Sequence, residues 1–530
     1  MELIPVLIIM IPIFASMIVY LTDTKYSNNV VFVAQVTLSI LAVKYFIEFE
    51  GLKEKHLLNL GNWNEVVSIV LRNDKISMLF IFLTILIWWM ILIYIWDTKK
   101  RDSKFIFLFI FLEGVFLGLL QTNDLFTMFV FIEITTILSS ILILYKMDGE
   151  SVRAGLYYLL FNSVGMMFYL LGMAFIYYSE GTLNIDILTA KINIYQGLNL
   201  TNLSYISIMA AVGVKSAFFP VYNWLPKAHS AAPSSISALL SGLLVKSGLY
   251  VFIRINSMYG LETFREFFII LGIFTAISGA IFAVSQKDLK QILAFSTISQ
   301  IGIIMIGLNQ LEGETLGGIM HIINHGIFKT LLFLSGGAVV SLYKKRDVTK
   351  IRGLLKNYPL LSIFMIVGIL SITGMPLFNG YVSKSIIKYG VYSKTLEYLM
   401  YFIDILTLTY FIKLSQIFFG EKNINLKNHK LGIYKKIPLY LLSLACIIFG
   451  NFYIPIYSLF TEASIKYINL FNISEWLLFG LKAAAAYFLY RIIVKKDYNF
   501  IKFLRRTNIS FSSTNFLFIL FITIMIIWKL

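Results

Sequence analysis

The chain consists largely of apolar runs, each about as long as a membrane span. Of its 530 residues, 58% are hydrophobic and 14% are charged, whereas soluble domains are about a quarter charged. A helix needs roughly 20 mostly apolar residues to cross a bilayer. The sequence therefore predicts an all-α polytopic membrane protein with about 14–16 transmembrane helices. About sixteen apolar segments lie near residues 2–22, 29–49, 76–96, 104–121, 124–145, 154–178, 202–222, 233–254, 264–285, 291–308, 313–342, 357–380, 396–419, 437–460, 471–493 and 510–529.

Lys and Arg gather in the odd-numbered loops between these segments. Such loops contain KKRDSK near 99–104, YKKRDVTKIRGLLK at 343–356 and RIIVKKDYNFIKFLRR at 491–506. Cytoplasmic loops of membrane proteins carry an excess of Lys and Arg. We therefore predict that the odd loops face the cytoplasm, that both termini lie outside, and that the protein is in the cell membrane of a prokaryote. The net charge of +17 follows from these loops, so no nucleic-acid partner is expected.

The chain has a single cysteine, Cys446, which lies within an apolar run. This excludes a disulfide within the chain and any iron–sulfur or zinc site built from several cysteines. The sequence also has no nucleotide-binding fingerprint. We therefore expect Cys446 to pack in the core, and we predict no cofactor and no metal site in this chain.

Several ionisable side chains lie inside the predicted spans. A charge at the centre of a bilayer costs roughly 2.5–3.5 kcal/mol, so each such residue is a functional candidate. Together they could pass protons from one titratable group to the next. The residues predicted to form this proton path are Glu133, Lys215, Lys246, His325, Lys329 and Lys384.

The spacing of these residues indicates how the path could work. His321, His325 and Lys329 follow one another at intervals of four, which places them on one helical face. A glutamate beside a buried lysine stabilises the charged lysine. We therefore predict that Glu133 pairs with Lys215 and that opening of this pair releases a proton towards Lys246.

Four further residues are secondary candidates for the same path. They are His321, Glu113, His229 and Asp404. Two of them have an equally simple structural explanation. Glu113 could pair with a polar group of a neighbouring helix, and His321 could bond to a backbone carbonyl.

Lysines outside this set also have structural explanations. Lys413 and Lys482 are expected either to reach towards the membrane surface or to form an interhelical salt bridge. Asp404 could pair with Lys413 in this way. Lys388 is expected to lie at the membrane interface.

Two spans contain helix-breaking residues beside a lysine, which predicts irregular backbone around a protein-lined cavity. The predicted breaks are at Pro220, Pro226, Pro233, Gly374, Pro376 and Gly380. The eleventh segment, near 313–342, is also expected to be irregular or kinked.

The two segments with predicted breaks are the seventh, near 202–222, and the twelfth, near 357–380, so they lie five segments apart along the chain. This offset predicts two inverted five-helix repeats, an arrangement typical of secondary transporters. The predicted division is 1–103 for helices 1–3, 104–256 for the first repeat, 257–420 for the second repeat and 421–530 for the C-terminal helices.

Four motifs carry a resemblance to a known family. They are VGVKSAFFPVYNWLPKAHSAAPSSISALLSGLLVKSGLY at 212–250, SQKDLKQILAFSTISQIGIIMIG at 285–307, HIINHGIFKTLLFLSGGA at 321–338 and SITGMPLFNGYVSK at 371–384. In this order they resemble the antiporter-like subunits of respiratory complex I, of Mrp sodium/proton antiporters and of membrane-bound energy-converting hydrogenases. The resemblance covers roughly residues 75–420. Among these subunits, the chain most resembles the D-type subunit of Mrp antiporters.

The resemblance implies a core of fourteen helices with two inverted repeats of five helices. It also implies an ion path through the positions that Glu133, Lys215, Lys246, His325 with Lys329, and Lys384 occupy here. Two features depart from the family pattern. Leu377 stands where many relatives have a second proline, and apolar segments continue beyond the expected last helix.

The predicted function is therefore that of a proton-translocating, antiporter-like subunit of a multi-subunit membrane complex. Its expected partners are small Mrp-type subunits, another antiporter-like subunit, or hydrogenase or redox subunits, within the lipid bilayer. The predicted transported ion is H⁺, and coupling to Na⁺ is an open alternative. Sodium prefers several oxygen ligands, and the sequence has no dense cluster of carboxylates to provide them. The alternative is a membrane subunit of an inorganic-carbon uptake complex paired with a zinc protein. A redox subunit and a purely structural anchor are less consistent with one cysteine and several buried charges.

Overall fold

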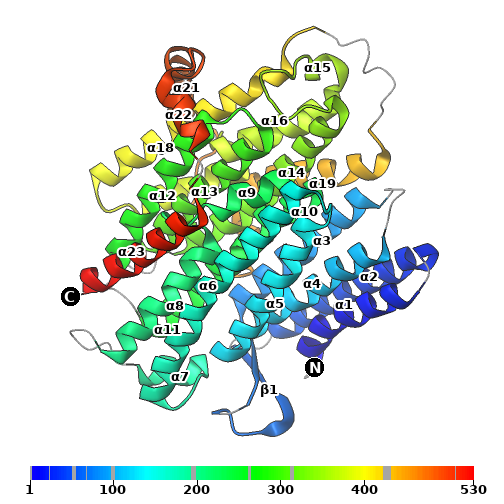
Figure 1. Cartoon of the computed structure of the whole chain (residues 1–530), viewed down its shortest axis with the longest axis vertical. Coiled ribbons are helices and arrows are strands. Elements are labelled where there is room, and N and C mark those ends of the chain that lie inside the picture. Colours follow the sequence, from blue (N-terminus) through cyan, green and yellow to red (C-terminus); the bar gives the residue numbers. More distant parts are fainter. Residues whose placement is uncertain are drawn as a thin grey trace.

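The structure is a computed structural model of the whole chain, and it is almost entirely helical (Figure 1). In the described part, the only strands are β1 (His56–Asn59) and β2 (Val70–Asn73), which pair as a short antiparallel hairpin. The structure describes residues 3–22, 24–50, 55–66, 68–96, 102–192, 199–260, 264–310, 315–421, 431–507 and 509–529.

Fourteen helices in the described ranges are long and apolar enough to cross a membrane. Most run alongside one another in Figure 1. They confirm the predicted all-α polytopic membrane fold. These spans are α1 (Ile4–Leu21), α2 (Thr24–Glu50), α3 (Lys75–Ile95), α4 (Ser103–Gln121), α5 (Leu125–Leu144), α6 (Gly149–Glu180), α10 to α11 (Ser234–Tyr259), α12 (Arg265–Ser285), α13 (Leu289–Leu308), α14 (Leu316–Tyr343), α18 (Lys394–Ser415), α19 (Ile433–Asn451), α21 (Ile473–Leu489) and α23 (Phe511–Lys529).

Aspartates begin several of these spans. Asp74, Asp124, Asp148 and Asp288 precede α3, α5, α6 and α13, and each carboxylate accepts a hydrogen bond from a backbone N–H of the first turn at 2.7–2.8 Å. Such caps satisfy amide groups that a helix leaves without a partner at its start. The polar residues between the apolar runs therefore determine where the spans begin.

The two remaining predicted segments form shorter helices because breaks interrupt them. α8 (Leu200–Ser216) has 17 residues and α16 (Pro359–Thr373) has 15 residues. Each is followed by a residue in the left-handed conformation, Ala217 and Gly374 respectively. With these two, every one of the predicted segments corresponds to a helix in the described part of the chain.

Short helices follow the breaks and connect the spans. After α8 the chain forms α9 and α10, and a π-helical turn, η2, joins α10 to α11. After α16 it forms α17. The short helices are α7 (Ile185–Lys191), α9 (Trp224–Ala231), α10 (Ser234–Leu239), η2 (Leu240–Leu244), α11 (Val245–Tyr259), α15 (Leu354–Asn357), α17 (Asn379–Tyr389), α20 (Tyr453–Ser458) and α22 (Asn499–Arg506), with single turns η1 (Leu60–Asn62), η4 (Gln416–Phe418) and η6 (Tyr490–Val494).

Three sequence predictions about breaks were wrong. Pro226 lies in the first turn of α9, where a proline costs no hydrogen bond. Gly380 is the second residue of α17; a Cβ there would clash with the carbonyl oxygen of Ser371, so the glycine permits close packing rather than a break. The eleventh segment forms one uninterrupted helix, α14. Pro220, Pro233 and Pro376 lie outside helices, and Gly374 caps α16.

Two backbone bridges link corresponding parts of the two predicted repeats. Near the start of α5, the N–H of Leu125 donates to Leu183 and the N–H of Ile185 donates to Asn123, 3.0 and 2.9 Å. Near the start of α13, Leu289 donates to Arg346 and Val348 donates to Lys287, each at 2.9 Å. The same pattern therefore joins α5 to the end of α6 and α13 to the end of α14. This match supports the inverted repeats and the domain boundaries, which stay predictions.

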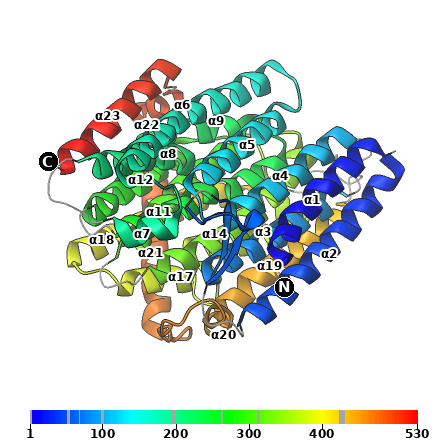
Figure 2. The ribbon, with the colours of Figure 1, turned by 90° about the horizontal axis from the view of Figure 1, so that it is seen from below.

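The C-terminal helices pack on both halves. α19 contacts α14 and α3, α21 contacts α18, and α23 contacts α8 and α6. Figure 2 looks onto the end of the molecule where the hairpin, α7 and α20 lie. Cys446 of α19 is buried and free, as the sequence predicted.

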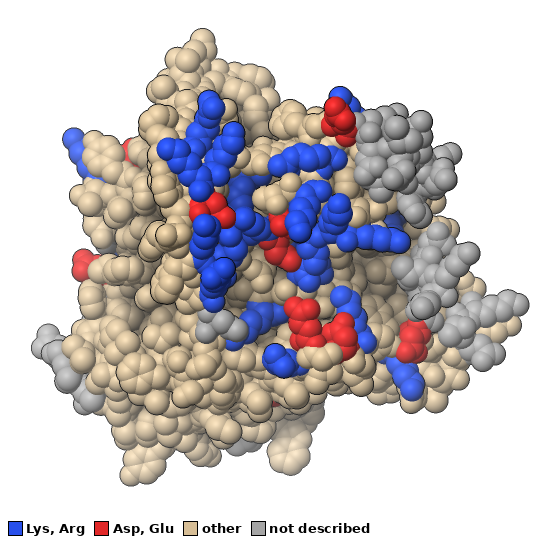
Figure 3. All heavy atoms as spheres, turned by 45° about the horizontal axis from the view of Figure 1, so that its top comes forward, with Lys and Arg blue, Asp and Glu red and all other residues tan. Residues whose placement is uncertain are grey.

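The basic loops meet at the opposite end (Figure 3). Lys287 forms an ion pair with Asp497 at 2.9 Å, and Arg346 pairs with Asp288 at 2.7 Å. These contacts bring the loops before α13, after α14 and before α22 together. Assignment of this basic end to the cytoplasm stays a prediction.

Candidate functional site: a buried chain of ionisable side chains

The site is centred on one face of α14. His321, His325 and Lys329 are each fully buried and follow one another at one-turn intervals, as predicted. The ring centroids of the two histidines are 6.4 Å apart. His325 is the only one of the three whose side chain has no hydrogen-bond partner within the described part of the chain. A continuous helix therefore carries three titratable groups through the core.

A polar face of α13 runs beside these groups. Ser296 accepts a hydrogen bond from the Lys329 ammonium, and the oxygen of Gln300 lies 3.1 Å from Nε2 of His321. Thr297 exchanges a hydrogen bond of 2.8 Å with Ser241 of the π-helical turn. None of these three α13 residues was predicted from the sequence. Their spacing in FSTISQ, at i, i+1 and i+4 in an otherwise apolar helix, was the available signal.

His321 connects this face to the broken helix of the second half. Its Nδ1 lies 2.8 Å from the hydroxyl of Ser383, the residue before Lys384. The Lys384 ammonium donates to the carbonyl of Ile372 at 3.0 Å. That carbonyl lies in the last turn of α16, where helices leave carbonyls without internal partners. The break therefore supplies an acceptor for a buried charge. Among the described residues, the ring of His321 bonds to the side chains of Ser383 and Gln300 and not to a backbone carbonyl.

Asp404 of α18 forms ion pairs with three lysines. Its carboxylate lies 3.2 Å from Lys384, 2.7 Å from Lys388 and 3.2 Å from Lys482, and its side chain is 5% exposed. Lys482 comes from α21, and its ion pair agrees with the predicted interhelical bridge. The carboxylate thus joins the broken helix, the helix after it and one of the C-terminal helices.

The predicted pairing of Asp404 with Lys413 was wrong. The Lys413 ammonium donates instead to the backbone carbonyls of Val284 and Gln286. Lys388 pairs with Asp404, and its location at the membrane interface stays a prediction. The rotation of α18 about its axis decides which groups Lys413 meets, and the sequence alone does not fix that rotation.

Lys246 lies where the two halves meet. It is fully buried, and its ammonium donates to the carbonyl of Ser241. Ser241 belongs to the π-helical turn η2, and its hydroxyl is the one that contacts Thr297 of α13. Lys246 is therefore tied to the same polar face as Lys329 and His321.

Lys215 lies at the end of α8, just before the first break. Its ammonium donates to the hydroxyls of Thr136 at 2.7 Å and Tyr158 at 3.3 Å. The predicted ion pair with Glu133 is absent between these two described residues. Glu133 is half-buried and lies three residues before Thr136 on α5, which places it one turn away on the same face.

A glycine brings the two lysines of the first half close in the fold. A Cβ at Gly248 of α11 would clash with the hydroxyl of Ser216 and lie 3.1 Å from the carbonyl carbon of Lys215. Only a glycine permits this approach of α8 to α11. Lys246 lies two residues before this contact, and Lys215 forms part of it.

Of the other candidates, Glu113 lies apart from this chain, whereas His229 lies beside it: the Phe333 ring on which His229 stacks is 5.9 Å from the Lys329 ammonium. Glu113 of α4 accepts a hydrogen bond from Gln35 of α2, which agrees with pairing to a neighbouring helix. The ring of His229 in α9 stacks on Phe333 with centroids 4.6 Å apart, and neither of its nitrogens has a hydrogen-bond partner among the described residues. Lys290, which the sequence analysis did not select, is 5% exposed and donates to the carbonyl of Ala232 at 2.7 Å.

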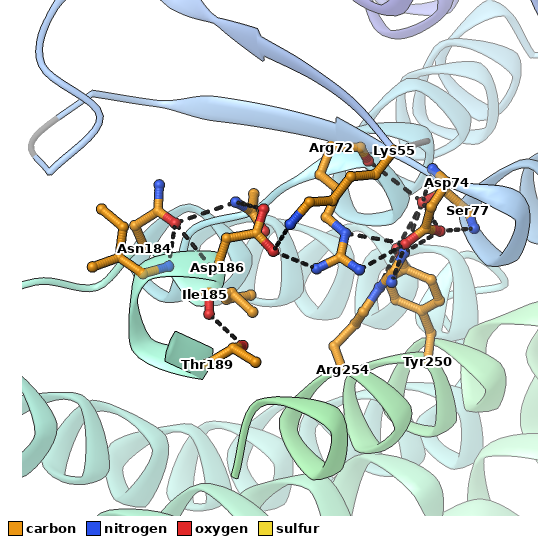
Figure 4. A network of polar contacts seen from close by, with 12 residues as sticks. Lys55, Arg72, Asp74, Ser77, Asn184, Ile185, Asp186, Thr189, Tyr250 and Arg254 are labelled. Atoms are coloured by element: carbon orange, nitrogen blue, oxygen red, sulfur yellow. Dashed lines mark hydrogen bonds and ion pairs between the residues drawn. The ribbon is translucent and has the colours of Figure 1, made fainter. Parts of the chain in front are cut away.

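A second polar network lies at the end of the molecule that carries the hairpin (Figure 4). Arg254 of α11 binds both carboxylate oxygens of Asp74 at 2.5 and 2.7 Å. Arg72 bridges Asp74 and Asp186, at 3.0 and 2.9 Å. Burial alone would raise the pKa of Asp74, but Arg254 and Arg72 hold that pKa well below its usual range. Within the described ranges, no group of three His, Cys, Asp or Glu residues could hold a metal ion.

The fold and this buried chain define a polytopic membrane protein with titratable groups connected through its core. A model of the family described as NADH:quinone oxidoreductase/Mrp antiporter, transmembrane part, matches residues 122–411. The chain belongs to this family, which confirms the resemblance predicted from the motifs. The match includes Lys215, Lys384 and Asp404 but ends before Lys482.

Two curated relatives have the same description, the D-type subunit of a Na⁺/H⁺ antiporter. The protein of Alkalihalophilus pseudofirmus is 32% identical over 336 residues, which cover 62% of this chain and 68% of the relative. The protein of Bacillus subtilis is 27% identical over 458 residues, which cover 84% of this chain and 93% of the relative.

Two solved structures share the fold. A chain of the membrane-bound sulfane sulfur reductase, an archaeal respiratory membrane complex, aligns with a TM-score of 0.80 and 24% identity, covering 91% of this chain and 99% of that chain. A chain of the Mrp complex from Dietzia sp. DQ12-45-1b aligns with a TM-score of 0.76 and 21% identity, covering 95% and 99%.

Proposed function

We propose that the chain is a proton-translocating, antiporter-like subunit of a multi-subunit complex in the cell membrane. Relatives described as Na⁺/H⁺ antiporter subunits support this function. Solved complexes with the same fold support partner subunits within the membrane. Nothing in these likenesses favours the alternative of inorganic-carbon uptake over antiport.

One observation carries the proposal: buried titratable groups from both halves meet along α13. Lys329 and His321 of α14 bind Ser296 and Gln300, and Ser241 beside Lys246 binds Thr297. A structural anchor has no need of several buried charges on one connected line, since each one is costly in a membrane. A proton path needs such a line.

In the proposed path, Lys384 exchanges protons with one side of the membrane through the second half. His321, which contacts Ser383 next to it, passes the proton along α14 through His325 and Lys329. Lys246 then transfers it to the first half. A neutral histidine has one nitrogen that donates and one that accepts, so it can take up a proton on one side and release one on the other, which suits the middle of such a path.

Lys215 and Glu133 complete the proposed path in the first half. Lys215 is held by the neutral hydroxyls of Thr136 and Tyr158, and Glu133 lies one turn from Thr136. We propose that a small movement of the Lys215 side chain forms and breaks its pair with Glu133. This movement controls whether Lys215 keeps its proton.

The proposed orientation follows from charge. The basic end holds the loops before α13, after α14 and before α22, and we assign it to the cytoplasm. Both termini then lie outside. The inverted repeats at 104–256 and 257–420 would each supply one half-channel. The small Mrp-type subunits, a second antiporter-like subunit, or hydrogenase or redox subunits are the proposed neighbours.

The proposal is tested in inside-out membrane vesicles that contain the assembled complex. Lys215→Ala and Glu133→Ala should each abolish ion-coupled proton transport while the complex still assembles. Lys345→Ala, in an exposed basic loop, is the matched control and should transport normally. Normal transport in either Lys215→Ala or Glu133→Ala would overturn the proposal.

A further inference from the structure

A cavity of about 400 Å³ opens at the basic end, between the core and the C-terminal helices. Its walls come from the start of α6, from α9, from the start of α13 and from the turn between α22 and α23. Four of its side chains are basic and one is acidic. They are Arg153, Lys227, Arg505, Arg506 and Glu150.

Two of the basic groups already have partners. Lys227 donates to the carbonyl of Ile509 at 2.8 Å and lies 3.8 Å from the ring centroid of Tyr157. Arg505 pairs with Asp497 and donates to the carbonyl of Ser285 at 2.7 Å. These contacts hold the wall of the cavity in shape.

Arg153 and Arg506 have no such partners. Among the described residues, neither guanidinium forms an ion pair or a hydrogen bond, and both side chains are exposed. The cavity therefore presents two available guanidinium groups and only one carboxylate, that of Glu150. Guanidinium groups bind phosphate oxygens in pairs of parallel hydrogen bonds, so a phosphate is an anion that these two groups can bind.

The surroundings indicate a phospholipid as the source of the phosphate. The cavity lies between the first turns of α6 and the residues just before α23, at the depth where spans meet the membrane surface. Leu156 and Leu160 follow Arg153 at i+3 and i+7 on α6 and are 46% and 54% exposed. An apolar surface thus runs along the membrane span below the basic groups. Basic pockets between membrane helices on the cytoplasmic side bind the headgroups of anionic lipids.

We propose that this cavity is a binding site for a phosphate group, supplied by the headgroup of an anionic phospholipid, with Arg153 and Arg506 as its principal ligands. Arg153 belongs to α6 and Arg506 to α22, so the bound phosphate bridges the core to the C-terminal helices. The site also borders Lys227 of α9, the short helix between Lys215 and Lys246. This inference does not depend on the proposed proton path.

The test uses the purified full chain in nanodiscs, with phosphatidylglycerol titrated into a phosphatidylcholine background and the melting temperature as the readout. Phosphatidylglycerol should raise the melting temperature of the wild-type chain. In the double variant Arg153→Gln/Arg506→Gln, about tenfold more phosphatidylglycerol should be needed for half of the increase, because charge-assisted hydrogen bonds are lost. The control Lys345→Gln/Lys350→Gln removes two exposed lysines of the same end outside the cavity.

The control variant should respond to phosphatidylglycerol as the wild type does. A second arm adds inorganic phosphate to the chain in neutral detergent. If inorganic phosphate stabilises the wild type but not the double variant, the site binds any phosphate anion. If only the lipid stabilises the wild type, the site is specific for the lipid headgroup. The proposal is overturned if the double variant responds like the wild type, or if the control loses as much as the double variant.

Discussion

The two halves of the molecule hold their lysines beside a helix break in different ways. In the second half, Lys384 is paired with Asp404, which also binds Lys388 and Lys482. In the first half, the hydrogen bonds that the Lys215 ammonium forms with described residues go to the neutral hydroxyls of Thr136 and Tyr158. Its predicted acid, Glu133, lies one turn away.

The first half has its strong ion pair elsewhere. Arg254 lies on α11, two turns after Lys246, and binds Asp74 through both carboxylate oxygens at the far end of the helix. The first half therefore has this ion pair away from Lys215, whereas the second half has its ion pairs at Lys384. If both lysines belong to the proposed path, we expect stability and transport to be separable in the first half and coupled in the second.

The largest effect is expected for Asp404→Asn. The buried Lys384 and the partly buried Lys388 and Lys482 would lose their carboxylate, and removal of one partner from a buried ion pair costs about 3–5 kcal/mol. Both proton transport and stability should be lost, measured as transport in vesicles and as the melting temperature of the purified chain. The control Glu397→Gln changes an acid in the first turn of α18 whose carboxylate accepts a hydrogen bond from Tyr401 and forms no ion pair with a described residue. Transport at the wild-type rate in Asp404→Asn would contradict the expectation that transport in the second half depends on the ion pairs of Asp404.

Thr136→Val tests the neutral anchor of Lys215. The substitution keeps the shape and removes the hydroxyl, so the ammonium loses one of its two described acceptors. We expect transport to fall about tenfold, which corresponds to roughly 1.4 kcal/mol. Thr136→Ser restores the hydroxyl and should restore the rate. A normal rate in Thr136→Val would mean that Lys215 is held by other groups.

Asp74→Asn should reduce stability and leave transport largely intact. We expect a loss of about 3 kcal/mol at neutral pH, because the Arg254 guanidinium loses its charged partner. Since the folded-state pKa of Asp74 is depressed, its contribution is fully present above the usual carboxyl value of 3.8 and is lost as the pH falls through the depressed value. The wild-type chain should therefore keep this contribution from neutral pH down to about pH 4. Loss of transport in folded Asp74→Asn protein would contradict the separation of anchor and path.

Lys482→Met should have the smallest effect. Asp404 keeps Lys384 and Lys388, so we expect transport within about threefold of the wild type, a difference below about 1 kcal/mol. The measurement is the initial rate of proton transport in vesicles. A complete loss of transport would mean that α21 belongs to the path itself.

The sequence predicted the spans and the buried charges because both follow from local composition. An apolar run of about 20 residues has few alternatives to a span, and a lysine such as Lys246 is conspicuous within it. The breaks in two of the spans were also predictable from local sequence, because prolines and glycines interrupt these apolar runs. Pro226 was misjudged because a proline in the first turn of a helix and one between helices look alike in sequence.

The partners of these charges were not predictable from one chain. Helical periodicity places Asp404 on a face of α18, but the neighbour that meets this face depends on helix rotation. The sequence suggested Lys413 as the partner of Asp404, whereas in the structure the carboxylate pairs with Lys384, Lys388 and Lys482. Ser296, Thr297 and Gln300 escaped notice because small polar residues are common in membrane helices.

Lys246→Met tests the central claim most directly. Lys246 is the lysine of the proposed path that links the first half, through Ser241, to α13 of the second half. Methionine keeps much of its volume and cannot carry a proton. The measurement is proton transport in inside-out vesicles, with assembly of the complex checked by its co-purification. A continuous path predicts that transport is abolished in an assembled complex, and transport at the wild-type rate would contradict it.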